Sequence, residues 1–279
     1  MTSLALPVVR LIGAPTDCHS SYLRGAALAP AAIRAALNSE HGNAAAESGV
    51  EIGVDVQIDD AGDVPLADTL AATAADDALL FDAVATASAF GAMPLVLGGD
   101  HAVSVPVVAA LAARHGPLNI LHFDAHPDLY DNYGDDPRSH ASPFARLLEA
   151  GHIGRLVQVG IRTMNRHCRE QVARFGVEVI EMKRFNLAEV PILDGPLYVS
   201  IDLDGFDPSV APGVAHLEPG GLSVRDVLHL LVQQSAPLVG ADIVELCPPR
   251  DPTGVTAILA AKLVRELAAL YVRNGAAPA

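Results

Sequence analysis

The sequence lacks tryptophan, has few other aromatic residues, and is short of positive charge. Phe, Trp and Tyr make up 4% of the 279 residues, and 18 Lys and Arg stand against 33 Asp and Glu, a formal net charge of -15. Proteins that bind nucleic acid need a basic surface, and many also stack bases on aromatic side chains. We therefore expect no nucleic-acid partner. The acidic balance by itself indicates solubility rather than a particular substrate.

Cysteine is also scarce, and no apolar stretch approaches the length of a membrane-spanning helix. The cysteines are odd in number and widely separated, without the paired spacing of a disulfide framework or a zinc cage. Residues 1–15 contain a short apolar run but neither a basic leader nor a small-residue cleavage site. We therefore expect a cytoplasmic protein that is neither secreted nor membrane-bound. The three cysteines are Cys18, Cys168 and Cys247.

What the sequence does contain is ample material for a hydrophobic core. Hydrophobic residues make up 51% and charged residues 18% of the chain, which excludes a disordered protein. A chain of 279 residues is long enough for one large α/β domain. We predict a single domain over residues 1–279.

Short apolar runs that close with Gly, Pro or Asp alternate with longer amphipathic segments. This alternation is typical of a parallel sheet with helices on its faces. Ser223 begins a Ser-Val-Arg-Asp run, which resembles a capping box at the start of a helix. We expect strands at 8–13, 94–97, 118–123, 156–160, 177–181, 197–201 and 239–243. We expect helices at about 29–38, 69–91, 103–115, 141–150, 165–175, 223–235 and 254–273.

Histidine and aspartate follow three of these predicted strands at the point where each strand ends. The runs are 98–101, 124–128 and 202–204. Open parallel sheets bind ligands at the carboxyl ends of their strands, so we expect the three runs to meet there. With the two-residue period of a strand, the polar side chains of each run project to one side. The six side chains are His101, Asp124, His126, Asp128, Asp202 and Asp204.

A lone histidine at a strand end is more often structural than a ligand, and an Asp-rich end is often a turn, as we expect at Asp207-Pro208. Four carboxylates crowded together, however, are costly to bury without a cation. Their charge of -4 balances two divalent ions. Oxygen-rich ligation without thiolate favours Mn²⁺ over structural Zn²⁺, although nickel or iron can use the same ligands. These residues predict two Mn²⁺ ions and metal-assisted hydrolysis.

The three runs resemble the signature motifs of the ureohydrolases, the family of arginases and agmatinases. Gly-Gly-Asp-His at 98–101, Asp-Ala-His-Pro-Asp at 124–128 and Ser-Ile-Asp-Leu-Asp-Gly-Phe-Asp-Pro at 200–208 match them in order and spacing. The resemblance extends from Ile12 to about Leu270. Stretches that look especially like the arginases of plants lie at 139–146, 211–221 and 239–245.

This resemblance implies a fold, an assembly and a ligand set. The family fold is a three-layer α/β/α sandwich around a central, mostly parallel sheet, usually assembled as a homotrimer or homohexamer. Asp124 and Asp202 would bridge two Mn²⁺ ions. The first ion would be bound by His101, Asp124, Asp128 and Asp202, and the second by Asp124, His126, Asp202 and Asp204.

The resemblance also implies catalytic and substrate-binding roles. A guanidinium is charged at any physiological pH, and its carbon is a poor electrophile. Glu245 matches the family carboxylate that pairs with the guanidinium, and His140 matches the family's proton shuttle. Asp128 would be both a metal ligand and a proton acceptor. For His216, substrate contact and simple loop structure are equally good interpretations.

Two further residues have less certain positions in such a site. His19 follows the first strand, and we expect it to line the entrance without a catalytic role. Cys247 stands where plant-type relatives carry Asn. The sequence therefore leaves undetermined the shape of the site wall next to Glu245.

The expected partner is a small cationic guanidino compound that is cut to urea and an amine. Tyr130 stands where many animal and bacterial arginases have Asn, as it does in agmatinases and plant-type arginases alike. The plant-type stretches favour L-arginine. Agmatine, guanidinobutyrate and formiminoglutamate are alternatives. A catalytically silent regulatory binding protein is the alternative from another class, and the presence of all six predicted ligands argues against it.

Overall fold

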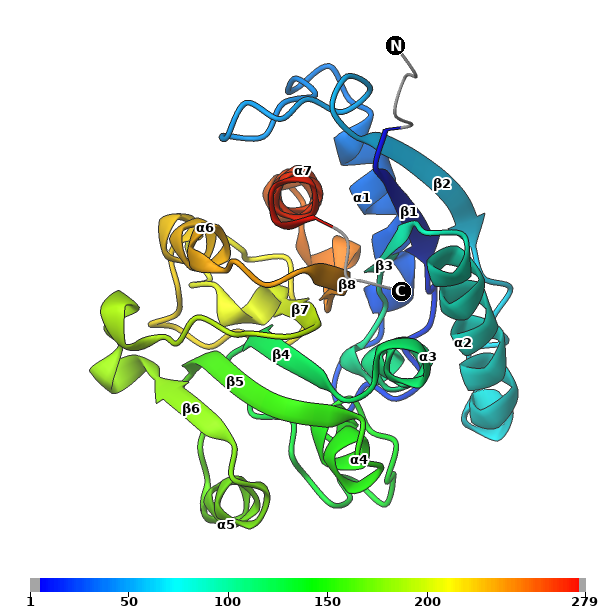
Figure 1. Cartoon of the computed structure of the whole chain (residues 1–279). Coiled ribbons are helices and arrows are strands. Elements are labelled where there is room, and N and C mark those ends of the chain that lie inside the picture. Colours follow the sequence, from blue (N-terminus) through cyan, green and yellow to red (C-terminus); the bar gives the residue numbers. More distant parts are fainter. Residues whose placement is uncertain (1–5, 276–279) are drawn as a thin grey trace.

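The computed structural model describes residues 6–275 and shows a twisted sheet between two layers of helices (Figure 1). Eight strands, all parallel, lie in the order β2-β1-β3-β8-β7-β4-β5-β6. The predicted α/β/α sandwich is therefore confirmed. The strands are β1 (Val8–Gly13), β2 (Gln57–Asp63), β3 (Met93–Leu97), β4 (Leu118–Phe123), β5 (Ile153–Ile161), β6 (Glu178–Glu181), β7 (Leu197–Asp202) and β8 (Leu238–Val244).

The seven α-helices divide between the two faces of the sheet and enclose two hydrophobic cores. One core lies under α1, α6 and α7, and the other under α2, α3 and α4, with α5 packed beside it (Figure 1). No helix within residues 6–275 is both long and apolar enough to cross a membrane. The helices are α1 (Ala29–Leu37), α2 (Thr73–Ala89), α3 (Ser104–His115), α4 (Pro143–Glu149), α5 (Arg166–Phe175), α6 (Val224–Gln233) and α7 (Val255–Asn274).

All seven predicted strands and all seven predicted helices are present, with ends that move by at most about four residues. The expected cap of α6 is also confirmed: Ser223 Oγ accepts from the Asp226 N–H at 3.1 Å, and Asp226 Oδ2 accepts from the Ser223 N–H at 2.9 Å. The sequence analysis missed β2. Its sequence, Gln-Ile-Asp-Asp-Ala-Gly-Asp, is polar because this outermost strand is largely exposed and pairs only with β1.

The four central strands determine where polar residues can gather. β3, β8, β7 and β4 are neighbours in the sheet and are almost entirely buried, with helices over both faces. Because the strands are parallel, their carboxyl ends lie at one edge. The segments that follow them in the chain therefore meet there, although they are separated by up to about 140 residues in sequence.

Gly99 occupies the tightest backbone contact at this edge. A Cβ on Gly99 would lie 1.6 Å from the Thr16 carbonyl oxygen and 3.0 Å from the Ala14 oxygen. The Gly99 N–H donates to that same Ala14 oxygen at 3.0 Å, which holds the two segments together. The segment after β3 can therefore lie this close to the segment after β1 only because residue 99 is a glycine and has no side chain.

We expect Gly99→Ala to lower the free energy of unfolding by at least about 1–3 kcal/mol, because an added methyl group must push two backbones apart. Urea denaturation measures the change. Gly42→Ala is the control, since the nearest atom to a Cβ there is 3.8 Å away on the flexible Arg265 side chain. Equal unfolding midpoints for the two variants would contradict the close approach at Gly99.

Candidate metal centre and active site

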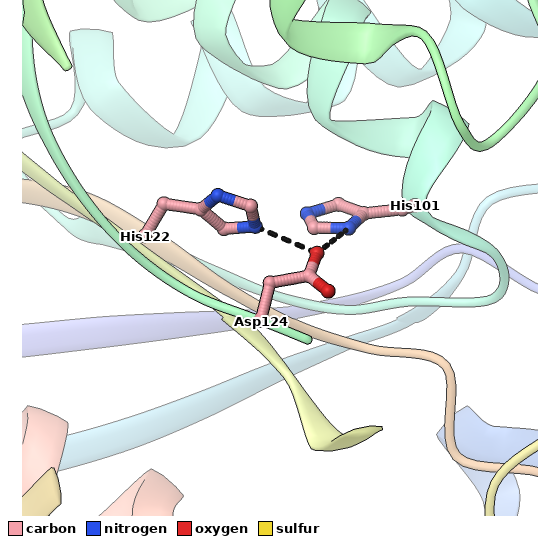
Figure 2. A group of neighbouring side chains, drawn as sticks. All are labelled: His101, His122 and Asp124. Atoms are coloured by element: carbon pink, nitrogen blue, oxygen red, sulfur yellow. Dashed lines mark hydrogen bonds and ion pairs between the residues drawn. The ribbon is translucent and has the colours of Figure 1, made fainter. Parts of the chain in front are cut away.

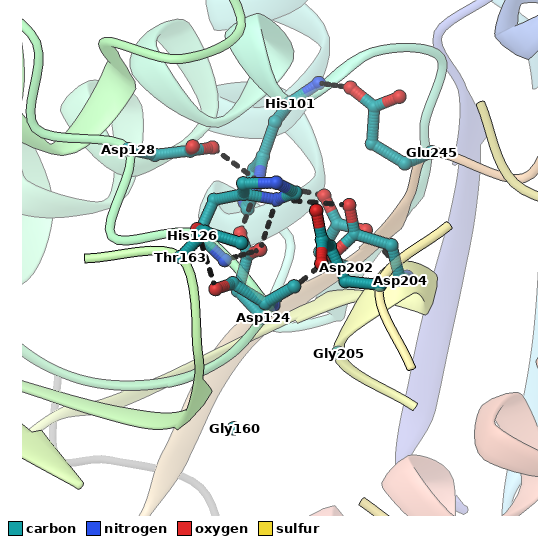
Figure 3. Close-up of polar contacts among 12 residues, drawn as sticks. His101, Asp124, His126, Asp128, Gly160, Thr163, Asp202, Asp204, Gly205 and Glu245 are labelled. Atoms are coloured by element: carbon teal, nitrogen blue, oxygen red, sulfur yellow. Dashed lines mark hydrogen bonds and ion pairs between the residues drawn. The ribbon is translucent and has the colours of Figure 1, made fainter. Parts of the chain in front are cut away.

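The loops after the four central strands bring all six predicted ligands to one place (Figure 3). His101 opens a short 3₁₀ turn after β3, and Asp124 directly follows β4. Asp202 is the last residue of β7, and Asp204 lies in the 3₁₀ turn Leu203–Gly205. Glu245 directly follows β8.

The three runs meet at the carboxyl edge of the parallel sheet, as expected, but the expected two-residue strand period through the Asp-rich runs is wrong. β4 ends at Phe123, and Asp128 has a left-handed backbone with φ of 50°. The loops are shaped instead by carboxylates that accept from nearby backbone. Asp124 Oδ1 accepts from the His126 N–H at 2.6 Å, and Asp202 Oδ1 accepts from the Asp204 N–H at 2.8 Å.

One contact also joins the two loops directly. Asp204 Oδ1 accepts from the Ala125 N–H at 3.1 Å. Gly205 permits this approach, because a Cβ there would lie 2.8 Å from the Asp124 nitrogen. The carboxylates from β4 and β7 are thus held against each other by backbone contacts.

His101 lies at the centre of the first group of ligand atoms. Its Nδ1 is 3.0 Å from Asp128 Oδ2 and 3.3 Å from both Asp124 Oδ2 and Asp202 Oδ2. This nitrogen is buried, yet it makes no well-directed hydrogen bond within the described part of the chain. Ligand atoms each about 2.1 Å from one ion in near-octahedral geometry lie about 3.0 Å apart. The spacing around Nδ1 therefore fits a shared divalent ion.

The other nitrogen of His101 is held by a chain of buried hydrogen bonds. Nε2 lies 2.9 Å from Ser200 Oγ, whose hydroxyl donates to Asp242 Oδ1 at 2.7 Å. Tyr198 and Ser104 donate to Asp242 Oδ2, both at 2.6 Å. Because Ser200 gives its proton to Asp242, its oxygen accepts from His101 Nε2–H. The lone pair of Nδ1 is thereby available to a metal ion.

His126 forms the second group with Asp204 and with Asp124, which also belongs to the first group. Its Nδ1 lies 3.1 Å from Asp204 Oδ2 and 3.4 Å from Asp124 Oδ1. The three residues offer ligand atoms that all lie within 4.8 Å of one another. Asp124 contacts both histidines, so it stands between the two groups.

The charges of these residues call for a cation. Burial and the neighbouring Asp204 and Asp124 carboxylates raise the pKa of Asp202 well above its usual value. Burial also raises the pKa of Asp204, to about 6. Burial lowers the pKa of His101, but three carboxylates outweigh it and raise that pKa well above its ordinary value. Positive charge is favoured here, as a proton or a metal ion, and the residues fit a binuclear metal centre.

The sequence analysis missed His122, a buried partner of the cluster (Figure 2). Its Nε2 lies 2.8 Å from Asp124 Oδ2, on the side of Asp124 that also faces His101. Burial lowers the pKa of His122, which favours the neutral imidazole. The signal was present in the sequence, because His122 lies in the predicted strand at 118–123, only two residues before Asp124.

The two predicted catalytic residues outside the metal set are hydrogen-bonded to each other. His140 Nδ1 lies 2.8 Å from Glu245 Oε1, which also accepts from the His101 N–H at 2.9 Å. Burial lowers the pKa of His140, but Glu245 outweighs it and raises that pKa to about 9. The Ser21 N–H donates to His140 Nε2 at 3.1 Å and favours the neutral form. These opposed influences suit a residue that both gives and takes a proton.

Backbone strain is concentrated in this site. Four non-glycine residues within 6–275 have positive φ, and two of them are Asp128 and Glu245. A left-handed backbone is uncommon for residues with a side chain and recurs at functional sites. Here it turns two carboxylates back toward the metal centre.

Most of the predicted residues line one cavity of about 140 Å³, but His101 and Asp124 are not part of its lining. His216 lines it, and its ring lies 5.4 Å from that of His140 and 5.7 Å from that of His126. No Lys or Arg is among the residues that line it. Tyr130, Tyr133 and Thr163 also line the cavity.

His19 lies elsewhere than expected. It does not line the cavity but is buried, with Nδ1 2.6 Å from Asp136 Oδ2 and Nε2 3.0 Å from Thr73 Oγ1. Cys247, whose effect on the wall the sequence left open, is buried outside the cavity lining, where its Sγ leaves no space for a side chain on Gly25.

Known proteins match the chain over nearly its whole length. A family model described as the Arginase family matches residues 8–269. The mitochondrial arginase 1 of Arabidopsis thaliana is 47% identical over 275 residues, which cover 93% of this chain and 80% of the relative. An agmatinase of Bacillus anthracis is 34% identical, covering 95% and 92% of the two chains.

The solved structure of the arginase from Medicago truncatula superposes with a TM-score of 0.90 at 43% identity, covering 95% of this chain and 87% of that one. Plant relatives are named mitochondrial or chloroplastic/mitochondrial, so the prediction of a cytoplasmic location is wrong by this comparison. The expectation of a cytoplasmic location rested on the absence of a leader-like pattern in residues 1–15, and that absence does not determine the location. The predicted resemblance to ureohydrolases, and to plant arginases in particular, is confirmed: the chain belongs to the arginase family.

Proposed function

We propose that this protein hydrolyses L-arginine to L-ornithine and urea at a binuclear manganese centre. The observation that carries the proposal is the buried Nδ1 of His101, which faces three carboxylates at 3.0–3.3 Å beside the Glu245–His140 pair. The greater identity to plant arginases, 47% against 34% for the agmatinase, supports arginine as the substrate. Family membership supports one catalytic domain over residues 1–279 and a homotrimer or homohexamer.

The six residues would hold two ions, with Asp124 and Asp202 shared between them. Oxygen-rich ligation with two imidazoles favours Mn²⁺. When bound, two such ions would lower the pKa of water, which is the chemistry that hydrolysis needs. The ligands that would hold them are His101, Asp124, His126, Asp128, Asp202 and Asp204.

Glu245 would bind the substrate's guanidinium. Its Oε1 accepts from the His101 N–H and from His140, so within the described chain Oε2 is left for a substrate N–H. A carboxylate is the natural partner of a guanidinium, which never loses its charge at neutral pH. The left-handed backbone of Glu245 aims the side chain back over the metal edge, where it can hold the reacting carbon.

Asp128 and His140 would move the protons. Asp128 Oδ2 belongs to the ligand group around His101 and can accept a proton from the attacking water. His140 lies on the cavity wall and is buried beside Glu245. It can return a proton to the departing alkylamine, which must leave as a neutral or protonated amine.

Agmatine is the second candidate substrate. Arginine carries a carboxylate at its far end and agmatine does not, and no Lys or Arg lines the cavity to pair with one. The cavity lining offers the Tyr130 hydroxyl, which accepts from Asn165 Nδ2 at 2.5 Å, whereas the Thr163 hydroxyl already donates to the Ala125 carbonyl oxygen at 3.0 Å. A neutral donor such as the Tyr130 hydroxyl is therefore the available partner for the arginine carboxylate if arginine is preferred.

We expect the Mn²⁺-loaded protein to release urea from arginine with a higher kcat/KM than from agmatine or 4-guanidinobutyrate. A colorimetric urea assay on the three compounds measures this preference. Faster turnover of agmatine would show that agmatine, and not arginine, is the preferred substrate. No urea from any of them would refute hydrolysis of guanidino compounds.

We expect His140→Ala to slow turnover by about 10²–10⁴-fold, the usual contribution of a proton-transfer residue. Both metal ions should remain, because His140 contacts Glu245 and Ser21 and no predicted ligand side chain. Steady-state kinetics and elemental analysis test the two parts. His229→Ala, at an exposed position on α6, is the control. Loss of metal from the His140 variant would show that it is not a proton shuttle.

We expect Glu245→Gln to lower kcat/KM for arginine by about 10- to 150-fold, since a charged hydrogen bond contributes about 1.5–3 kcal/mol. Metal content should not change. Glu266→Gln is a matched control, because Glu266 is also a buried glutamate, bonded to Lys262 and the Glu47 N–H far from the cavity. Equal activity of the two variants would show that Glu245 does not bind the substrate.

A further inference from the structure

We infer that Gln158 is a positioning residue that holds His122 in one tautomer and, through it, sets Asp124 for metal binding. Gln158 lies in β5, directly beside His122 of β4 in the sheet register, and both side chains are fully buried. This inference rests on the proposed metal centre and concerns residues below it, which contact no substrate.

The orientation of the Gln158 amide follows from its two partners. Its Nε2 lies 2.6 Å from the Pro127 carbonyl oxygen and 3.0 Å from His122 Nδ1. A carbonyl oxygen can only accept, so the amide nitrogen, and not its oxygen, must face Pro127. Both hydrogens of the amide are then used, one on each partner. His122 Nδ1 must therefore be an acceptor without a proton.

The tautomer of His122 determines what faces Asp124. With Nδ1 unprotonated, the proton of the neutral imidazole is on Nε2, which donates to Asp124 Oδ2 at 2.8 Å. The opposite tautomer would place a nitrogen lone pair against that carboxylate. The same Oδ2 atom lies 3.3 Å from His101 Nδ1, in the first ligand group. The Gln158 amide thus acts on the ligand that stands between the two groups.

Gln158 also holds the loop that carries two other ligands. Pro127, whose carbonyl it binds, lies between His126 and Asp128. Phe144 packs against the His122 ring at a centroid distance of 4.2 Å and leaves that ring no room to turn. One amide therefore aligns the bridging carboxylate and the loop beside it.

The glutamine is placed for its two N–H donors and not for its oxygen. Its Oε1 is buried and has no hydrogen-bond partner in residues 6–275, whereas both hydrogens of its Nε2 are used. The two acceptors, the Pro127 carbonyl and His122 Nδ1, both lie next to metal ligands, so the donors serve the metal site.

We expect Gln158→Met to weaken Mn²⁺ binding about 10- to 100-fold, the usual effect of losing a group that orients a metal ligand. The thermal midpoint of the metal-free variant should also fall, because the buried Pro127 carbonyl and His122 Nδ1 lose their donors. Equilibrium dialysis of Mn²⁺ against the full chain, stripped of metal by a chelator, measures the affinity. A loss of metal-free stability with wild-type Mn²⁺ affinity would instead assign Gln158 to the fold and overturn the inference.

Gln171→Met is the matched control. Gln171 is also a buried glutamine, and its Nε2 donates to the carbonyl of Leu129 at 2.9 Å, two residues beyond Pro127. It contacts no predicted ligand, so its variant should bind Mn²⁺ as the wild type does. An equal loss of affinity in both variants would mean that loosening the loop is sufficient, and would overturn the role of the tautomer.

His122→Phe tests whether the two residues act as one unit. The single variant should lose affinity to a similar extent, and adding Gln158→Met should cause little further loss. Additive losses, or wild-type affinity in Gln158→Met, would overturn the inference while leaving the metal centre in place. A wild-type protein that binds no Mn²⁺ would overturn both.

Discussion

The structure depends on one constraint: carboxylates buried at the edge of a parallel sheet must be compensated by positive charge. Asp124 is fully buried, and Asp202 and Asp204 are nearly so. Burial of such groups is costly unless each is hydrogen-bonded and paired. Backbone N–H groups satisfy one oxygen of each carboxylate, from the same loop for Asp124 and Asp202 and from the neighbouring loop for Asp204. The remaining oxygens point toward the imidazoles, where a cation would bind.

The sheet supports this edge with a row of polar side chains one step below it. Asp242, Ser200, His122 and Gln158 come from four neighbouring strands and lie opposite one another in register. All four are fully buried. The first two hold His101 and the last two hold Asp124, so the orientation of each ligand is set by the strand beside it as well as by its own. Buried hydrogen-bonded networks of this kind make a site rigid.

Features that lower the stability of the fold lie at this same edge of the sheet. Asp128 and Glu245 adopt left-handed backbone, and Gln158 keeps an unpaired buried oxygen. Two hydrophobic cores, one on each face of the sheet, surround this region and stabilise the fold as a whole. Strained backbone and unsatisfied polar groups persist only where the surrounding structure stabilises them. They are typical of functional sites.

The order of the elements and the residues of the metal cluster could be predicted from sequence, because both are local patterns. Alternating apolar runs indicated seven strands and seven helices, and the side chains that follow β3, β4 and β7 stand out against those runs. The edge strand β2 could not be predicted, because an exposed strand needs no apolar residues. The conformations of the Asp-rich loops could not be predicted either, because backbone hydrogen bonds, and not strand periodicity, determine them.

The sequence by itself determined which chemical groups are present, and the tertiary structure decided which of them work together. His122 and Gln158 are 36 residues apart and carry no motif of their own. His19 and Cys247 follow strands as the ligands do, yet both are buried away from the cavity. Only the order and register of the strands place one residue beside another, and those are set by the packing of the whole sheet between its two helical layers.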